Sequence, residues 1–164
     1  MTFEKDAFCS YCGAKYRSER WPRECGACGN TVWRNPTPVA VAVVPCGGGI
    51  LGVRRGIMPK KGELALPGGF IDFGESWQRG VCRELFEELG VVAEPDEVSL
   101  LAAHSVPNGR QIILFGLTTP VDPASLPPFA PNEEVTERVV LTGGETLAFP
   151  LHEDVMRQYF AGRR

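Results

Sequence analysis

The stretch that decides the fold is residues 69–91, which read Gly-Phe-Ile-Asp-Phe-Gly-Glu-Ser-Trp-Gln-Arg-Gly-Val-Cys-Arg-Glu-Leu-Phe-Glu-Glu-Leu-Gly-Val. Its apolar residues predict a helix over 76–89, because at about 100° per residue they fall on one face. Gly90 is placed to end that helix. Along the edge of the same face lie three carboxylates, those of Glu84, Glu87 and Glu88. The sequence therefore predicts a helix that is buried on one side and presents a row of acids on the adjoining side.

These acids repel one another, which weakens a helix by about 0.2–0.5 kcal/mol per pair. A solvated acidic face is the simplest interpretation, and Arg83 can relieve part of the repulsion through Glu87. That interpretation leaves the preceding Pro67-Gly68-Gly69 unexplained. Glycines permit a tight turn at a strand end, where backbone carbonyls can point at an ion. Because Mg²⁺ prefers carboxylate and carbonyl oxygens, the sequence indicates a magnesium site here.

The rest of the chain has the pattern of an α/β protein. The junction 35–38 contains two prolines, and we expect it to separate a small segment, 1–36, from a domain over 37–164. The predicted strands are 39–45, 50–55, 62–66, 98–104, 111–121 and 135–142. The first two form a predicted hairpin around three glycines, residues 121–132 form a proline-rich loop, and 152–160 form a closing helix. We expect a mixed sheet with helices on its faces.

Two copies of Cys-x-x-Cys-Gly occupy the N-terminal segment, at Cys9 and Cys12 and at Cys25 and Cys28. Four thiolates complete a tetrahedral zinc site with no open position, so this Zn²⁺ is predicted to be structural. Metal binding would supply the folding energy of a segment with almost no core. Redox-active pairs are the alternative. The remaining cysteines, Cys46 and Cys82, are interpreted as packing residues.

Composition and charge narrow the class of protein. The chain has 164 residues, 43% hydrophobic and 23% charged, and no run resembles a membrane span of about 20 apolar residues. Its N-terminus lacks the pattern of a secretory signal, and we expect a cytoplasmic protein. Of the net charge of −3, residues 1–36 carry +2, from six basic and four acidic side chains, which leaves −5 for the rest. This asymmetry is compatible with an anionic ligand but too small to indicate nucleic acid.

Residues 69–91 resemble the Nudix box, Gly-x5-Glu-x7-Arg-Glu-U-x-Glu-Glu-x-Gly-U, where U is aliphatic. Every defined position matches: Gly69, Glu75, Arg83, Glu84, Leu85, Glu87, Glu88, Gly90 and Val91. The resemblance implies an α/β/α sandwich and a Mg²⁺- or Mn²⁺-dependent hydrolase that cleaves a nucleoside diphosphate linked to another group by water attack at phosphorus. It also implies metal ligation by Glu84, Glu87, Glu88 and a backbone carbonyl near Gly68, with Glu75 and Arg83 orienting these ligands.

A four-cysteine zinc ribbon, here residues 1–36, before a Nudix domain is similar to two subfamilies. NADH pyrophosphatases carry a Ser-Gln-Pro-Trp array after the box, and residues 92–110 contain nothing like it. A group that includes FAD and ADP-ribose pyrophosphatases is more similar, through Phe8 before the first cysteine pair, Asn35-Pro36, the paired arginines Arg54-Arg55 and the stretch 146–149. Leu64 departs from that group, which often has Trp there. The resemblance therefore favours an FAD or ADP-ribose type of dinucleotide as the substrate, and many relatives form homodimers.

Residues outside the box supply further candidates. Arg54 and Arg55 are suited to binding a diphosphate, although a solvated strand edge explains them equally well. The general base is Glu88 or one of three acids after the proline-rich loop, namely Glu133, Glu134 and Glu137. Two other functions stay open. In one, the N-terminal aromatics stack on RNA and the domain removes a nucleotide cap; in the other, the protein is a non-catalytic nucleotide sensor, which would have no need of a complete set of box carboxylates.

Overall fold

The computed structural model describes residues 5–162. It divides the chain into two compact units, Met1–Pro36 and Thr37–Arg164. Among the described residues, no helix has the length and apolar character needed to cross a membrane.

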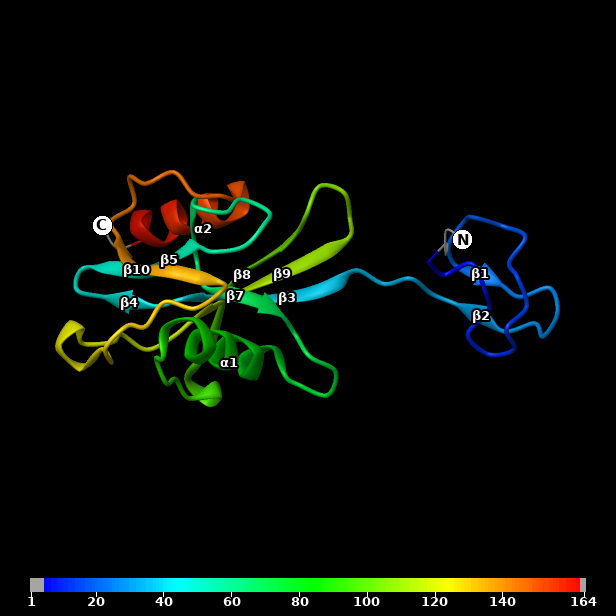
Figure 1. Cartoon of the computed structure of the whole chain (residues 1–164), viewed down its shortest axis with the longest axis horizontal. Coiled ribbons are helices and arrows are strands. Elements are labelled where there is room, and N and C mark those ends of the chain that lie inside the picture. The colour runs from blue at the N-terminus through cyan, green and yellow to red at the C-terminus, as the bar shows by residue number, and fades with distance from the viewer. Residues whose placement is uncertain (1–4, 163–164) are drawn as a thin grey trace. The chain divides into compact units, whose positions relative to one another are not determined.

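Over residues 5–36, the N-terminal unit has one short pair of strands (Figure 1) and two similar cysteine turns. In each turn the glycine after the second cysteine donates its N–H to the carbonyl of the first, Gly13 to Cys9 at 2.9 Å and Gly29 to Cys25 at 2.8 Å. Both glycines have positive φ, 75° and 72°, which explains why glycine follows each cysteine pair. Strands β1 (Arg23–Glu24) and β2 (Thr31–Val32) pair antiparallel beside these turns.

Within residues 37–162, the second unit contains two four-stranded sheets. The first has the order β7-β3-β9-β8 and is mixed, because β3 (Thr37–Val43) is parallel to β9 (Gln111–Leu117) and antiparallel to β7 (Gly68–Phe70). Strand β8 (Ser99–Ser105) closes its edge. The second sheet is antiparallel and centres on β5 (Gly49–Arg55), which pairs with β10 (Val135–Leu141), β4 (Pro45–Cys46) and β6 (Leu64–Ala65).

The predicted hairpin between 39–45 and 50–55 is only partly formed. The turn is in the expected place, but only the short β4 pairs with the start of β5. Strand β3 lies instead between β7 and β9 in the other sheet. Residues 40–44 are buried completely or almost completely, as is typical of a strand covered on both faces. The chain therefore passes from one sheet to the other at Val44, a change that a continuous apolar run does not reveal.

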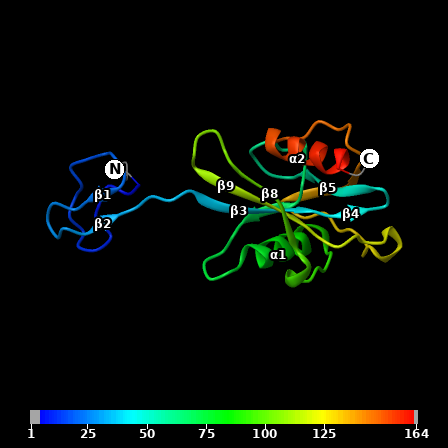
Figure 2. The same cartoon turned by 180° about the vertical axis from the view of Figure 1, so that it is seen from behind.

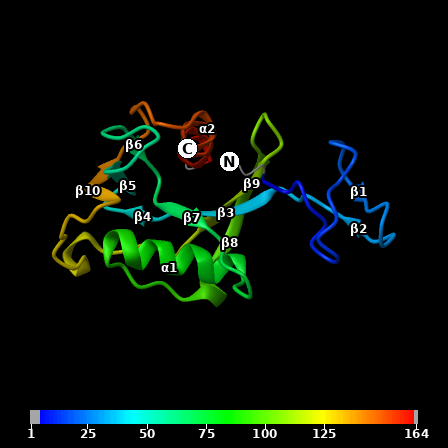
Figure 3. The same ribbon diagram turned by 45° about the vertical axis from the view of Figure 1, so that its right-hand side comes forward.

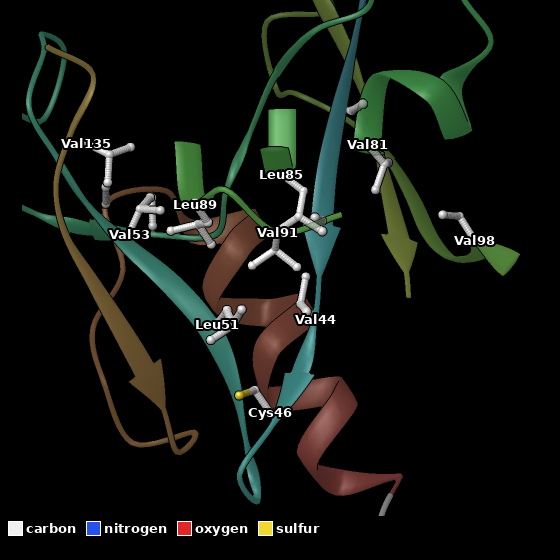
Figure 4. Close-up of a cluster of buried hydrophobic side chains, with 14 residues drawn as sticks. Val44, Cys46, Leu51, Val53, Val81, Leu85, Leu89, Val91, Val98 and Val135 are labelled. Atoms are coloured by element: carbon white, nitrogen blue, oxygen red, sulfur yellow. The ribbon is translucent and has the colours of Figure 1, made fainter. Parts of the chain in front are cut away.

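Helix α1 (Trp77–Leu89) and helix α2 (Pro150–Ala161) cover opposite faces of the sheets, as Figures 1 and 2 both show. Successive side chains of β3 point alternately towards α1 and towards α2. Ala40, Ala42 and Val44 belong to the core under α1, whereas Val41 and Val43 belong to the core under α2. In Figure 4, Leu85 and Leu89 of α1 meet Val44 and Leu51 from the two sheets. The expected α/β/α sandwich is confirmed.

The ends of the elements follow local chemistry. Helix α1 begins after Ser76, whose side chain accepts the N–H of Arg79, and ends at Gly90 with a left-handed φ of 68°. Helix α2 begins at Pro150, two residues before the predicted start, because proline suits the first helical turn. Strand β9 stops at Leu117 rather than at 121. Two 3-10 turns, η1 (Pro95–Glu97) and η2 (Pro123–Ser125), lie where the sequence indicated no element.

Candidate active site

Helix α1 packs beside β7 (Figure 3), and its acidic edge contacts the start of that strand through Glu88 and Gly68. Glu84 and Glu88 are 7% and 8% exposed, and Glu87 lies in solvent. Glu88 accepts the backbone N–H of Gly68 at 3.0 Å. Of the three carboxylates in the predicted row, two are therefore buried and one is exposed. A group bound to all three would be shielded from solvent on one side and accessible to it on the other.

Arg83 holds this acidic edge together. Its Nε and Nη2 donate to the two oxygens of Glu75, each at 3.0 Å. Its Nη1 donates to Glu84 at 2.7 Å and to Glu87 at 3.1 Å. Its Nη2 also donates to the carbonyl of Phe70 at 2.7 Å, which ties the helix to β7. Arg83 thus relieves repulsion in the row, as the sequence indicated for Glu87, and positions Glu84 as well.

The pKa values of the carboxyl groups are shifted in different directions. Burial, the charge of Glu84 and that of Glu134 raise the pKa of Glu88 to about 8, although the Gly68 N–H and Arg55 oppose this shift. Burial also raises the pKa of Glu84, against the effect of Arg83. The hydrogen bonds from Arg83 lower the pKa of Glu75. Two buried carboxyls thus lie in surroundings that disfavour their charge, and a cation beside them would reverse that preference.

The glycines at 68 and 69 leave space for two different neighbours. A Cβ on Gly69 would lie 2.4 Å from Oε1 of Glu84, and one on Gly68 would lie 2.3 Å from the carbonyl of Ala40. Gly69 therefore lets the Glu84 carboxylate approach the backbone of β7, whereas Gly68 lets β7 approach β3. Both glycines lie in β7 and serve close approach, whereas the sequence indicated a tight turn at these positions.

The paired arginines have separate surroundings. Arg54 donates to Glu137 at 2.7 Å and to the carbonyl of Gly62 at 2.9 Å. The Nε of Arg55 donates to the carbonyl of Pro59 at 2.9 Å, and its guanidinium lies 5.1 Å from the ring centre of Phe149. Arg55 also acts on the Glu88 carboxyl electrostatically. Of the two arginines, Arg55 therefore belongs to the surroundings of the buried acids, and Arg54 is engaged in an ion pair across the sheet.

The three acids after the proline-rich loop also have different surroundings. Glu137 pairs with Arg54, while the charge of Glu134 raises the pKa of both Glu84 and Glu88, after the larger effect of burial. Glu133 places its backbone carbonyl against Gly56. The sequence reasoning missed Asn132, whose side chain accepts the N–H of Glu134 at 2.9 Å and donates to the carbonyl of Glu87 at 3.2 Å. Its signal was an asparagine before a strand, which is typical of an Asx turn.

Comparisons with known proteins identify the family of the chain. The family model described as the NUDIX domain matches residues 36–158. The chain belongs to the NUDIX family. An ADP-ribose pyrophosphatase of Methanocaldococcus jannaschii is 44% identical over 59 residues, 36% of this chain and 34% of that protein. The NAD-capped RNA hydrolase NudC of Edwardsiella ictaluri is 27% identical over 88 residues, 52% of this chain and 34% of that protein. The matches thus span about a third of the length of these relatives.

Solved structures show the same NUDIX fold. A NUDIX hydrolase from Nitrosomonas europaea has a TM-score of 0.76 at 24% identity, over 95% of this chain and 91% of that one. A bifunctional NMN adenylyltransferase/ADP ribose pyrophosphatase from Francisella tularensis, complexed with AMP and a manganese ion, has a TM-score of 0.57 at 21% identity, over 79% of this chain and 41% of that one. At these identities the likeness concerns the fold.

The unit that precedes the NUDIX domain brings its four cysteines together. Among residues 5–162, the Sγ atoms of Cys9, Cys12, Cys25 and Cys28 form a group of possible metal ligands that lie within 4.8 Å of one another. Backbone and side-chain hydrogen bonds from Asn30 lower the pKa of Cys28, which favours a thiolate. The hydroxyl of Tyr16 is buried without a hydrogen-bond partner in the described structure, although it lies close to Cys9. Convergent sulfurs with nearby donors fit Zn²⁺.

The other two cysteines of the chain lie in the NUDIX domain. Cys46 is buried and Cys82 half-buried, and both pack in the core under α1. Burial raises the pKa of each thiol. Their surroundings agree with the interpretation as packing residues.

Proposed function

We propose that the chain is a metal-dependent hydrolase that cleaves the diphosphate bond of a nucleoside diphosphate-linked substrate of the ADP-ribose or FAD type. The observation that carries the proposal is the arrangement of Glu84 and Glu88, buried against the glycine turn and joined to Glu75 and Glu87 through Arg83. Membership of the NUDIX family and the similarity to an ADP-ribose pyrophosphatase favour this reaction over a non-catalytic sensor.

Glu84, Glu87 and Glu88, with a backbone carbonyl near Gly68, are the residues that would hold Mg²⁺ or Mn²⁺. The fit rests on the space above Gly69, which the Glu84 carboxylate fills, and on the raised pKa of the two buried carboxyls. When bound, the metal would supply Lewis acidity and a water of lowered pKa. Arg83 and Glu75 would position the ligands, since Arg83 contacts two of them directly.

Glu134 is the acid that we propose as the general base, in preference to Glu133, Glu137 and Glu88. It is held by Asn132 beside the end of α1, and its charge acts on the buried carboxyls. It would take a proton from the attacking water while the water oxygen bonds to phosphorus. The bond from phosphorus to the bridging oxygen breaks, and for ADP-ribose the products are AMP and ribose 5-phosphate.

Arg55 is the residue that we propose for binding the diphosphate. Its Nε bond to Pro59 and its packing over Phe149 fix the guanidinium, and its charge acts on the Glu88 carboxyl. A planar guanidinium is suited to phosphate oxygens, and its positive charge would offset the acidity of the site. Arg54 would act only indirectly, by fixing the loop that ends at Gly62.

The cysteine cluster would hold a structural zinc ion. All four ligand positions of a tetrahedral site are taken by sulfur, which leaves no place for a substrate. We propose no catalytic role for it.

The test is turnover of ADP-ribose, FAD, NADH and nucleoside triphosphates with Mg²⁺, followed by product chromatography. Wild type is compared with Glu88→Gln and with Glu94→Gln, a control at an exposed glutamate of the same domain. Because the pKa of Glu88 is about 8, the amide resembles the neutral acid that the fold holds without a cation. We expect Glu88→Gln to remain folded and lose about 10²–10³-fold in kcat, since removing one metal ligand forfeits several kcal/mol. No turnover of any substrate, or full activity of Glu88→Gln, would contradict the proposal.

Removal of an NAD cap from RNA is a second candidate. Two relatives are named as NAD-capped RNA hydrolases, at 27% and 25% identity. Among residues 5–36, three aromatic side chains on which bases can stack are exposed, those of Phe8, Tyr11 and Trp33. Comparing turnover of ADP-ribose with that of an NAD-capped oligonucleotide separates the two. If the oligonucleotide is preferred and Tyr11→Ala abolishes that preference, the second candidate replaces the first.

A further inference from the structure

The segment that joins β6 to β7 passes from the sheet centred on β5 to the sheet that contains β3 (Figure 3). Its backbone groups are hydrogen-bonded to different parts of the domain. The carbonyl of Leu64 accepts the N–H of Ala148 at 2.7 Å, and the carbonyl of Pro67 accepts the N–H of Ala42 at 2.8 Å. At its far end the N–H of Gly68 reaches Glu88. The segment is therefore a strap whose last bond orients a proposed metal ligand.

The middle of this strap is held by a side chain. The N–H of Leu66 donates to Nδ1 of His152 at 3.2 Å. His152 lies in the first turn of α2, is 6% exposed and packs between the rings of Phe115 and Phe149, with centroids at 5.5 and 5.1 Å. Because Nδ1 accepts a hydrogen bond, the ring is neutral and carries its proton on Nε2.

Packing alone does not account for a histidine at this position. The surroundings are aromatic and aliphatic, so phenylalanine would fill the space without burying an imidazole. What phenylalanine lacks is an acceptor for the N–H of Leu66, a residue that is 2% exposed and whose amide would otherwise be buried without a partner. Histidine therefore adds an acceptor for the N–H of Leu66, which lies two residues before Gly68.

We infer that His152 is a positioning residue for the carboxylate site: it fixes the N–H of Leu66, and through it the turn that orients Glu88. This inference rests on the proposed function, since it assigns His152 to the same metal site from the opposite layer of the sandwich. His152 touches neither the metal nor the substrate; it acts through the backbone of residues 66–68.

The experiment measures Mn²⁺ affinity by electron paramagnetic resonance, without substrate, in the full-length protein. The variants are His152→Phe, which removes the acceptor, and His152→Asn, whose Oδ1 replaces Nδ1 as an acceptor. Val155→Ala is the matched control, because Val155 is buried in the same helix and contributes packing alone to the core under α2. All proteins are compared at a temperature at which circular dichroism shows them folded.

We expect His152→Phe to weaken Mn²⁺ binding about tenfold, at the lower end of the range for outer partners of metal ligands. His152→Asn and Val155→Ala should stay within about threefold of wild type. Unchanged affinity in His152→Phe, or an equal loss in Val155→Ala, would overturn the inference. If His152→Phe does not fold, His152→Asn is compared with His152→Gln, whose oxygen lies nearer the place of Nε2; equal affinities would then overturn it.

The same titration separates failure of this inference from failure of the proposed function. If wild type binds no Mn²⁺, or if Glu88→Gln binds Mn²⁺ as tightly as wild type does, the proposed metal site is wrong. If wild type binds Mn²⁺ through Glu88 but His152→Phe binds it equally well, only the role of His152 is wrong.

Discussion

Replacing Gly69 by alanine adds one methyl group beside the Glu84 carboxylate. The new Cβ would lie 2.4 Å from Oε1, 2.6 Å from Cδ and 2.7 Å from Oε2. Ordinary contact between carbon and oxygen begins at about 3.4 Å, so the carboxylate has to retreat by about 1 Å. The φ of Gly69 is not in the left-handed region, and the backbone can therefore accept alanine.

The magnitude follows from that displacement. A misplacement of about 1 Å at a catalytic constellation costs about 10²-fold in rate, or about 2.7 kcal/mol in the barrier. Because a side-chain carboxylate moves rather than backbone, we expect the free energy of unfolding to change by less than about 1 kcal/mol. Gly69→Ala should thus lose activity and metal affinity while it keeps its fold.

The assay combines kcat for ADP-ribose hydrolysis with thermal unfolding, and two glycines serve as controls. A Cβ on Gly144 meets nothing within 4 Å, so Gly144→Ala should change neither quantity. A Cβ on Gly68 meets the backbone of Ala40 and Val41 at 2.3 and 2.7 Å, so Gly68→Ala should lose about 1–3 kcal/mol or more of stability. In a Glu84→Gln background, Gly69→Ala should cause little further loss. Wild-type kcat in Gly69→Ala, with Glu84→Gln inactive, would refute the reasoning.

Three further perturbations test separate parts of the molecule. Burial, and less strongly Arg55, lower the pKa of His152 from 6.5 to about 3, so the stability that its neutral form contributes is complete above pH 6.5 and lost as the pH falls towards 3. Between pH 6.5 and 3, the free energy of unfolding should therefore fall more steeply in wild type than in His152→Phe, by up to about 1.4 kcal/mol per pH unit. Urea unfolding midpoints that change in parallel with pH in the two proteins would contradict this. Arg83→Lys should reduce kcat by about 10–100-fold, because an ammonium cannot bridge Glu75 and Glu84 as the guanidinium does, and wild-type kinetics would refute the role given to Arg83. A strong chelator, or Cys9→Ser, should release one zinc ion per chain and abolish the dispersed amide signals of residues 5–36; retained signals after zinc loss would contradict a structural zinc.

Local chemistry made part of this molecule predictable. The helix over 76–89 was predicted almost to the residue, because Ser76 and Gly90 are strong end signals that act within a few residues. The acidic edge followed from the helical period alone. The cysteine turns were predictable for the same reason, since each closes on its own glycine.

Long-range pairing was not predictable in the same way. Strand β7 is three residues of Gly-Gly-Phe, with no alternation, and exists because β3 pairs with it. The passage of the chain between sheets at Val44 is decided by partners more than 60 residues away in β9. The separation of Glu134 from Glu133 and Glu137 depends on a bulge in β10 and on the Arg54 ion pair. His152 carries no local signal, because its partner amide lies 86 residues before it.

The most direct test of the account is the rate of AMP release from ADP-ribose as Mg²⁺ is titrated, in wild type and in Glu84→Gln. The account predicts release that requires Mg²⁺ and saturates with it in wild type. In Glu84→Gln it predicts a rate about 10²–10³-fold lower, because several kcal/mol of charge stabilisation is lost. Release that is independent of Mg²⁺, or equal in the two proteins, would contradict the claim that the carboxylates of α1 form a metal-dependent hydrolytic centre.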